Sequence, residues 1–192
     1  MDYRLDIASA PDSIPGGTAV LLTHPSTGGT DEIDTGFLAV DGDRFLVVST
    51  RSTAREVHQK LSHYDVDASR ADVLDAVSVD RGYSRRNAEH VHYVNAPDDV
   101  DGIVSVVAAF LEEDGGRRRL SVDSVSELAY YAGDATAVSA VRRIVDRLEE
   151  HDAVGLFHVS PEVHDPDTMD RLRAVTHGTL AVDDDGSIDA RF

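Results

Sequence analysis

The residues of this chain that could do chemistry follow its apolar runs. The run Thr18–Leu22 leads into the loop His24–Thr30, whose sequence is HPSTGGT. In glycine-containing loops that bind phosphate, backbone N–H groups surround the phosphates, a lysine neutralises them and a Ser or Thr hydroxyl binds Mg²⁺. Gly29 stands where that lysine would be, whereas Thr30 supplies the hydroxyl. Three interpretations stay open: a nucleotide site, the remnant of one, or a turn that only begins a helix.

Acidic residues follow this loop directly. Asp31, Glu32 and Asp34 add negative charge where a phosphate would arrive. Acids in the first turn of a helix stabilise it by about 0.3–1 kcal/mol each, because they face the positive end of the helix dipole. They also compete with an anionic ligand for that dipole. The acids therefore favour a capped helix start over a working phosphate site.

A further acid ends the run Leu120–Val122. Asp123 holds the position at which P-loop proteins place the Asp that organises Mg²⁺. Ser124 and Glu127, which follow, have the spacing of a helix capping box. A magnesium-organising acid and a simple helix start are both consistent with this segment.

The run Phe45–Ser49 ends without an acid. A hydrolytic site would need a carboxylate near here to orient water. The sequence instead offers Arg51 and Ser52, and its next acid is Glu56. Ser52 or Thr53 is predicted to cap a helix at this point.

Histidines offer a metal site as an alternative. His90 and His92 lie two residues apart and would share one face of a strand. His158 and His164 lie near Glu162. None of these spacings has the specificity of an H-E-x-x-H motif, so no metal ligand is predicted. No catalytic residue is predicted either.

The elements that position these residues alternate between strands and helices. Strands are predicted over six short apolar runs: Thr18–Leu22, Phe45–Ser49, His90–Val94, Leu120–Val122, Val154–Val159 and Thr179–Val182. Helices are predicted where apolar residues recur at helical spacing: Thr53–Tyr64, Val100–Glu113, Ala135–Glu150 and Asp167–Val175. This alternation predicts an α/β fold with a mostly parallel sheet covered on both faces. One domain over residues 1–192 is expected, with Asp65–Gly82 as a surface excursion.

The composition points to a protein adapted to salt. The net charge is −18, 27 of the 36 acids are Asp, and Lys60 is the only lysine beside 17 arginines. At molar ionic strength the Debye length falls to about 3 Å, which screens this self-repulsion. The acidic surface argues against binding of nucleic acid. No apolar run reaches the length of a membrane span, so a cytoplasmic protein without membrane contact is expected.

Two arginine clusters stand out from the acidic background. Arg81–Arg86 is interpreted as a salt-bridged surface loop, and Arg117–Arg119 as a solvated connection between a helix and a strand. Tyr83 within the first cluster could stack on a base. Tyr130 and Tyr131 fit either an exposed aromatic patch or the core.

Four stretches in this order resemble a known family: IPGGTAVLLTHPSTGGT, FLVVSTRSTAREVHQKL, RRRLSVDSVSELAYY and VGLFHVSPEVHDPDTMDRLRAVTHGTLAV. Together they are similar to the RecA-superfamily ATPases of the KaiC-like type, over roughly Ile14 to Val182. The resemblance implies a three-layer RecA-like P-loop fold that binds ATP at a subunit boundary. It also implies that Thr30 corresponds to the Mg²⁺-side hydroxyl and Asp123 to the Mg²⁺-organising acid.

The sequence departs from this family at the positions that hydrolysis needs. The P-loop lysine is replaced by Gly29, and the acidic pair after the second core strand by Arg51-Ser52. The helix after the loop is expected to be short, because Gly36 interrupts it. The resemblance therefore supports the fold and argues against the activity.

The sequence thus predicts a vestigial nucleotide site formed by Thr27, Gly28, Gly29, Thr30 and Asp123. The favoured function is a non-hydrolysing RecA/KaiC-like module that acts through a protein partner or a homo-oligomer, in regulation or signalling. No cofactor is expected, with ATP and Mg²⁺ as the alternative. One alternative function is an ATPase or nucleotide-switched protein completed by an arginine, in cis or in trans from a neighbouring subunit, with Arg51, Arg85 and Arg86 as candidates. Another is a DNA-associated regulator, supported only by the two arginine clusters.

Overall fold

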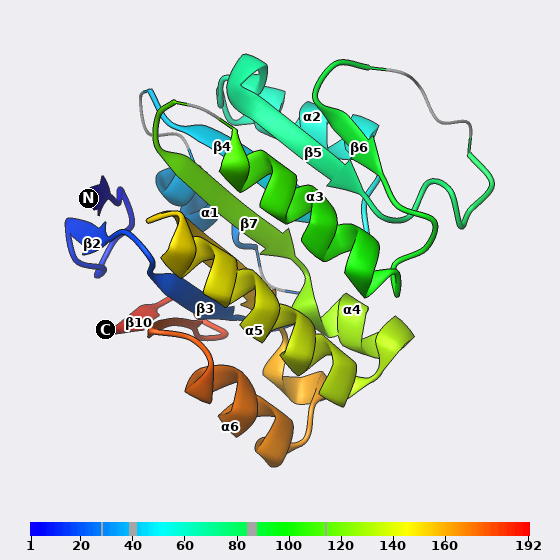
Figure 1. The fold of residues 1–192 in the computed structure, drawn as a ribbon. Helices are drawn as coiled ribbons and strands as arrows, with labels where there is room; N and C mark the ends of the chain where they lie inside the picture. Colours follow the sequence, from blue (N-terminus) through cyan, green and yellow to red (C-terminus); the bar gives the residue numbers. More distant parts are fainter. Residues whose placement is uncertain (28, 39–41, 84–87, 114) are drawn as a thin grey trace.

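The computed structural model describes residues 1–27, 29–38, 42–83, 88–113 and 115–192. Within them, eight strands form one sheet in the order β10-β9-β3-β8-β7-β4-β5-β6 (Figure 1). All neighbouring strands are parallel except β10, which runs antiparallel to β9. The strands are β3 (Ala19–Thr23), β4 (Arg44–Ser49), β5 (Ala71–Asp75), β6 (Val91–Tyr93), β7 (Arg118–Asp123), β8 (Val154–Val159), β9 (Gly178–Val182) and β10 (Ile188–Arg191).

Helices cover both faces of the sheet. They are α1 (Asp31–Leu38), α2 (Ala54–His63), α3 (Val100–Glu112), α4 (Val125–Ala132), α5 (Asp134–Glu150) and α6 (Pro166–Ala174). A small sheet of β1 (Asp2–Arg4) and β2 (Ser13–Pro15) lies on the side of α1 and α2. The predicted α/β fold with a mostly parallel sheet flanked by helices is confirmed.

Two apolar cores result from the alternation of side chains along each buried strand. In β3, Leu21 packs into a core with α3, α4, α5 and α6, whereas Val20 and Leu22 pack into a second core with α1 and α2. Because both faces are buried, most central strands are near-continuous apolar runs rather than alternating with polar residues, and β7 is an exception because it carries buried Arg118 and Arg119. This explains why the central strands were visible in the sequence as short continuous apolar runs.

The prediction that Asp65–Gly82 is a surface excursion was wrong, because this stretch contains the buried strand β5. Its acids Asp72 and Asp75 interrupt the apolar pattern, yet both are buried. The Asp75 carboxylate accepts hydrogen bonds from the backbone N–H groups of Ala54, Val77 and Ser78. Buried carboxylates are tolerated when they are satisfied in this way, and the sequence pattern does not reveal that they are.

The interpretation of Arg117–Arg119 as a solvated connection was also wrong, because Arg118 and Arg119 lie inside β7 and are buried. The Arg119 guanidinium is fully buried, and its Nε donates to Asp43 Oδ2 at 2.7 Å. Its two remaining nitrogens donate to the carbonyl oxygens of Phe37 and Arg4. Because the guanidinium is paired in this way, it can be buried, although a solvated position was predicted from the sequence.

Helix α1 is short, as predicted, and Gly36 lies inside it rather than ending it. A Cβ at position 36 would overlap the carbonyl oxygen of Asp6, whose N–H donates to the Gly36 carbonyl at 3.0 Å. The glycine is therefore required by the close approach of the N-terminal segment.

Candidate functional site

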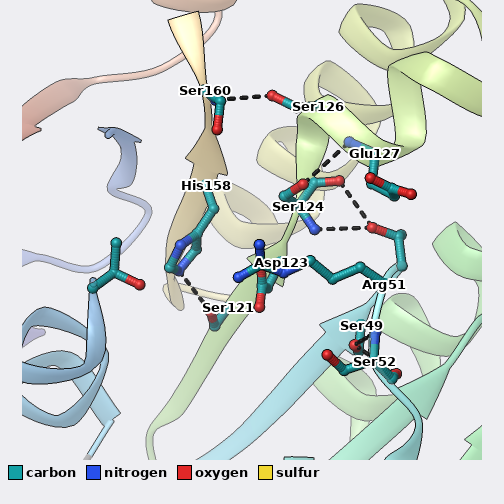
Figure 2. A network of polar contacts seen from close by, with 12 residues as sticks. Ser49, Arg51, Ser52, Ser121, Asp123, Ser124, Ser126, Glu127, His158 and Ser160 are labelled. Atoms are coloured by element: carbon teal, nitrogen blue, oxygen red, sulfur yellow. Dashed lines mark hydrogen bonds and ion pairs between the residues drawn. The ribbon is translucent and has the colours of Figure 1, made fainter. Parts of the chain in front are cut away.

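The predicted site residues lie at the carboxyl edge of the sheet, where α/β proteins bind ligands. The order of the strands places β8 between β3 and β7, so the segments that follow these three strands adjoin one another. Figure 2 shows His158 of β8 beside Ser121 and Asp123 of β7, with Arg51 reaching in from the segment after β4. Residue 28, the predicted Gly28, lies outside the described residues.

Thr30 is buried, and its hydroxyl donates to Asp34 Oδ2 at 3.1 Å, one turn along α1. The hydroxyl that would bind Mg²⁺ is therefore engaged by a carboxylate of the chain itself. Thr27 and Gly29 are exposed. Open space surrounds the position of a Cβ at Gly29, so packing does not explain the loss of a lysine there.

Asp34 is the centre of an ion-pair network that the sequence did not reveal. Its Oδ1 lies 2.8 Å from Nε2 of His158, and its Oδ2 lies 3.0 Å from Nζ of Lys60. Lys60 also contacts Asp31 at 2.8 Å, and Asp31 accepts a hydrogen bond from Tyr64 at 2.6 Å. The chain's only lysine thus joins α2 to the first turn of α1.

The pKa values of these groups all shift toward their charged forms. Burial alone would lower the pKa of His158, but the Asp34 carboxylate outweighs it and raises that pKa. Burial would raise the pKa of Asp34, but His158 and Lys60 hold it far below its usual range. Burial would lower the pKa of Lys60, but Asp34 and Asp31 raise it. These shifts favour the charged forms of His158, Lys60, Asp34 and Asp31.

Asp123 ends β7, as predicted, and its Oδ1 lies 2.9 Å from Nε of Arg51. Ser124, not Asp123, is the N-cap of α4, because its Oγ accepts from the N–H of Glu127. The predicted cap at the start of α2 is Thr53, which forms a reciprocal capping box with Glu56. The acid that would organise Mg²⁺ is thus paired with an arginine.

The loop after β3 is also bound by an acid of the chain. The N–H of Ser26 donates to Oε1 of Glu162 at 2.5 Å. Glu162 lies in a 3₁₀ turn, Pro161–Val163, that follows β8. A backbone N–H that could face a phosphate is therefore already satisfied by a carboxylate.

A small cavity of about 70 Å³ lies between α1, α2 and the sheet. Its wall includes Asp34, Lys60 and Asp123 together with apolar residues such as Val47 and Leu61. Pockets for small organic ligands measure about 300–1,000 Å³, so this cavity is large enough for a few waters and too small for a nucleotide. A larger groove of about 650 Å³ between α2 and β6 contains none of the predicted site residues.

Sequence reasoning missed His24. This residue follows β3 and is buried, and its Nδ1 lies 2.9 Å from the carbonyl oxygen of Pro25. Its ring meets that of His158 edge to face, with 5.5 Å between the ring centres. Burial lowers the pKa of His24, and the positive charge on His158 adds to this effect. The sequence places His24 at the start of the loop His24–Thr30, but it does not show that the His24 ring meets that of His158.

The other predicted groups do not join the site. Nδ1 of His90 and Nε2 of His92 lie 3.1 and 3.4 Å from Oδ1 of Asp72. His164 bridges Ser126 and Asp134. Among the described residues, no group of three or more His, Asp or Glu side chains could hold a metal ion. Residues 85 and 86, the predicted arginines, lie outside the described part of the chain.

The tyrosine pair on α4 is exposed. Tyr130 is 81% exposed and meets Tyr131 edge to face, which decides in favour of the exposed patch. In the described ranges, no helix has the length and apolar character needed to cross a membrane.

Comparisons with known proteins show the fold. A model of a family of unknown function, DUF7090, matches residues 1–192. No curated protein matches the sequence. An uncharacterised Pyrococcus horikoshii protein in complex with an unknown peptide is similar at a TM-score of 0.68 and 12% identity, over 92% of this chain and 83% of that one. A KaiC-like protein from the same archaeon is similar at a TM-score of 0.64 and 14% identity, over 97% of this chain and 86% of that one.

An ATPase from the type III secretion system of pathogenic bacteria is similar at a TM-score of 0.66 and 13% identity. The similarity covers 98% of this chain, which spans only 61% of that ATPase. Together these likenesses confirm the predicted RecA-like, KaiC-like fold.

Proposed function

Because the chain belongs to DUF7090, a family of unknown function, we propose its role from the site itself. The protein is a RecA/KaiC-like module that does not hydrolyse ATP and acts through contact with other proteins, in regulation or signalling. Its partner is another protein or a second copy of this chain. We further propose that it works in a salt-rich cytoplasm, which its charge of −18 and its single lysine support.

One observation carries this proposal: the charged groups at the carboxyl edge of the sheet neutralise one another. The carboxylates of Asp31, Asp34 and Asp123 pair with Lys60, His158 and Arg51. A triphosphate with Mg²⁺ would have to break these pairs and bring further negative charge to three acids. The internal pairs therefore favour a structural role for this edge over nucleotide chemistry.

The fold neighbours give a limited second support. One of them was solved with a peptide bound, so this architecture can carry a peptide-binding surface. At 12% identity the likeness concerns the fold alone, and the binding surface of this chain has to be argued from its own residues.

We expect no Mg-ATP turnover above background, and no binding of ATP or ADP up to millimolar concentration, by calorimetry in molar KCl. Restoring the missing lysine with Gly29→Lys is expected to give no turnover either, because Asp34 still accepts the Thr30 hydroxyl and Glu162 still accepts the N–H of Ser26. Thr30→Ala and Asp123→Ala are the controls. Turnover by the wild-type chain that both controls abolish would contradict the proposal.

A nucleotide-binding protein is the second candidate, and the position of Arg51 favours it. Its guanidinium lies beside Asp123, at the edge where an arginine could stabilise phosphoryl charge (Figure 2). If ATP binds, Arg51→Gln is expected to weaken the affinity at least about tenfold, because a charge-assisted contact is worth about 1.5–3 kcal/mol. Arg55→Gln on α2 is the matched control. Equal affinity in wild type and Arg51→Gln would remove Arg51 from that role.

The third candidate, a DNA-associated regulator, loses support. Of the two arginine clusters behind it, the one at residues 117–119 has two of its side chains buried in the sheet. A buried arginine cannot contribute to a basic surface for DNA.

A further inference from the structure

A groove between α5 and α6 presents two arginines that have no acidic partner among the described residues. Arg142 of α5 and Arg171 of α6 both line this groove, whose volume is about 210 Å³. The arginines next to them are paired: Arg143 contacts Asp101 at 2.8 Å and Arg173 contacts Asp170 at 3.0 Å. Acids outnumber basic residues by 36 to 18 in this chain, so two unpaired arginines facing one groove call for an explanation.

Apart from Val138, which is buried, the rest of the groove is lined by small side chains. Ala135, Ser139 and Arg142 follow one another at i, i+4 and i+7, so they share one face of α5. Ala174 lies one turn after Arg171 on α6, which packs against α5 (Figure 1). Small residues between two helices let the backbone of a partner approach closely, with an arginine on each wall.

Two guanidinium groups in this arrangement are suited to carboxylates. Arginine presents a planar fork that binds a carboxylate through two parallel hydrogen bonds. A nucleic acid would need a broader basic footprint, and the net charge of −18 repels a polyanion. The helices also carry acids such as Asp146, Asp167 and Asp170, which would repel a ligand with many negative charges.

We propose that the groove between α5 and α6 docks an acidic segment of a partner protein. Two carboxylates of the segment pair with Arg142 and Arg171, and its backbone lies over Ala135, Ser139 and Ala174. The inference rests on the proposed role in protein contact, and it names the surface and the chemistry of the partner.

The test uses a fluorescent helical peptide of alanines with pairs of Glu four residues apart, and a matched peptide with Gln in place of Glu. Anisotropy titrations with the full chain in 1 M and 3 M KCl are expected to show binding of the Glu peptide alone, weaker at the higher salt. The double variant Arg142→Gln/Arg171→Gln is expected to bind at least tenfold more weakly. The matched control Arg143→Gln/Arg173→Gln, which changes the paired arginines of the same helices, is expected to stay within twofold.

Equal weakening in both double variants, or no binding of the Glu peptide by the wild-type chain, would overturn the proposal. A DNA duplex or inorganic phosphate that bound through Arg142 and Arg171 in place of the peptide would also overturn it. ATP turnover would contradict the proposed function and leave the peptide titration unaffected, so the two failures can be told apart.

Discussion

Replacing Asp43 with alanine is expected to lower the free energy of unfolding by about 3–5 kcal/mol, because it leaves the Arg119 guanidinium buried without a counter-charge. Arg119 is fully buried and Asp43 nearly so, which limits screening of their pair by salt. The pair also joins the segment before β4 to β7, and Arg119 holds the carbonyl oxygens of Phe37 and Arg4. Urea unfolding in 2 M KCl, followed by far-UV circular dichroism, measures the loss.

The control for this prediction is Asp170→Ala, which removes an exposed partner of Arg173. Exposed pairs contribute about 0–1 kcal/mol, so little change is expected there. The double variant Asp43→Leu/Arg119→Met, which replaces both charges with apolar side chains, is expected to recover part of the stability. If Asp43→Ala lowered the free energy of unfolding by less than about 1 kcal/mol, the Arg119 guanidinium would have to be hydrated in the variant, and the prediction would be wrong.

Replacing His158 with glutamine is expected to cost about 3 kcal/mol at pH 6 and clearly less at pH 9. The pKa of His158 is raised, so its contribution is complete below the ordinary histidine pKa of about 6.5 and is lost as pH rises through the raised value. The pKa of Asp34 is lowered, so its contribution is complete above the ordinary value of about 4 and is lost only in stronger acid. The pair is therefore strongest between about pH 4 and 6.5.

Urea unfolding between pH 6 and 10 in 2 M KCl checks this prediction. The wild-type chain is expected to lose stability toward alkaline pH more steeply than His158→Gln does. His177→Gln is the matched control, because His177 pairs with Glu149 at an exposed position. Parallel pH profiles for the wild-type chain and His158→Gln would show that the buried pair does not control this slope.

The central part of the fold could be predicted from the sequence because its strands are buried on both faces. Val154–Val159 is predicted and found with the same bounds, and the helix Ala135–Glu150 differs from α5 by one residue. Strand β5 could not be predicted, because Asp72 and Asp75 interrupt it. The bonds that make those acids acceptable in the interior come from residues distant in the chain, such as Arg44 and Ala54.

The site was predictable only in part, for a similar reason. The sequence locates Thr30 and Asp123 by the strands that precede them, and it identifies the missing lysine at Gly29. It does not reveal that Lys60 and His158 converge on Asp34, since these three residues lie on α2, β8 and α1. Spacing along one helix or strand predicts a shared face, but contacts between elements depend on the order of strands in the sheet.

The position of Lys60 decides how partners of this protein can be found. Amine-directed cross-linkers and acylating labels need a deprotonated amine, and the pairs with Asp31 and Asp34 keep Lys60 protonated. Lysine-based cross-linking surveys will therefore under-sample this protein, whatever it touches. Reagents that couple carboxylates, or photoreactive residues introduced beside the groove of α5 and α6, will report its contacts instead.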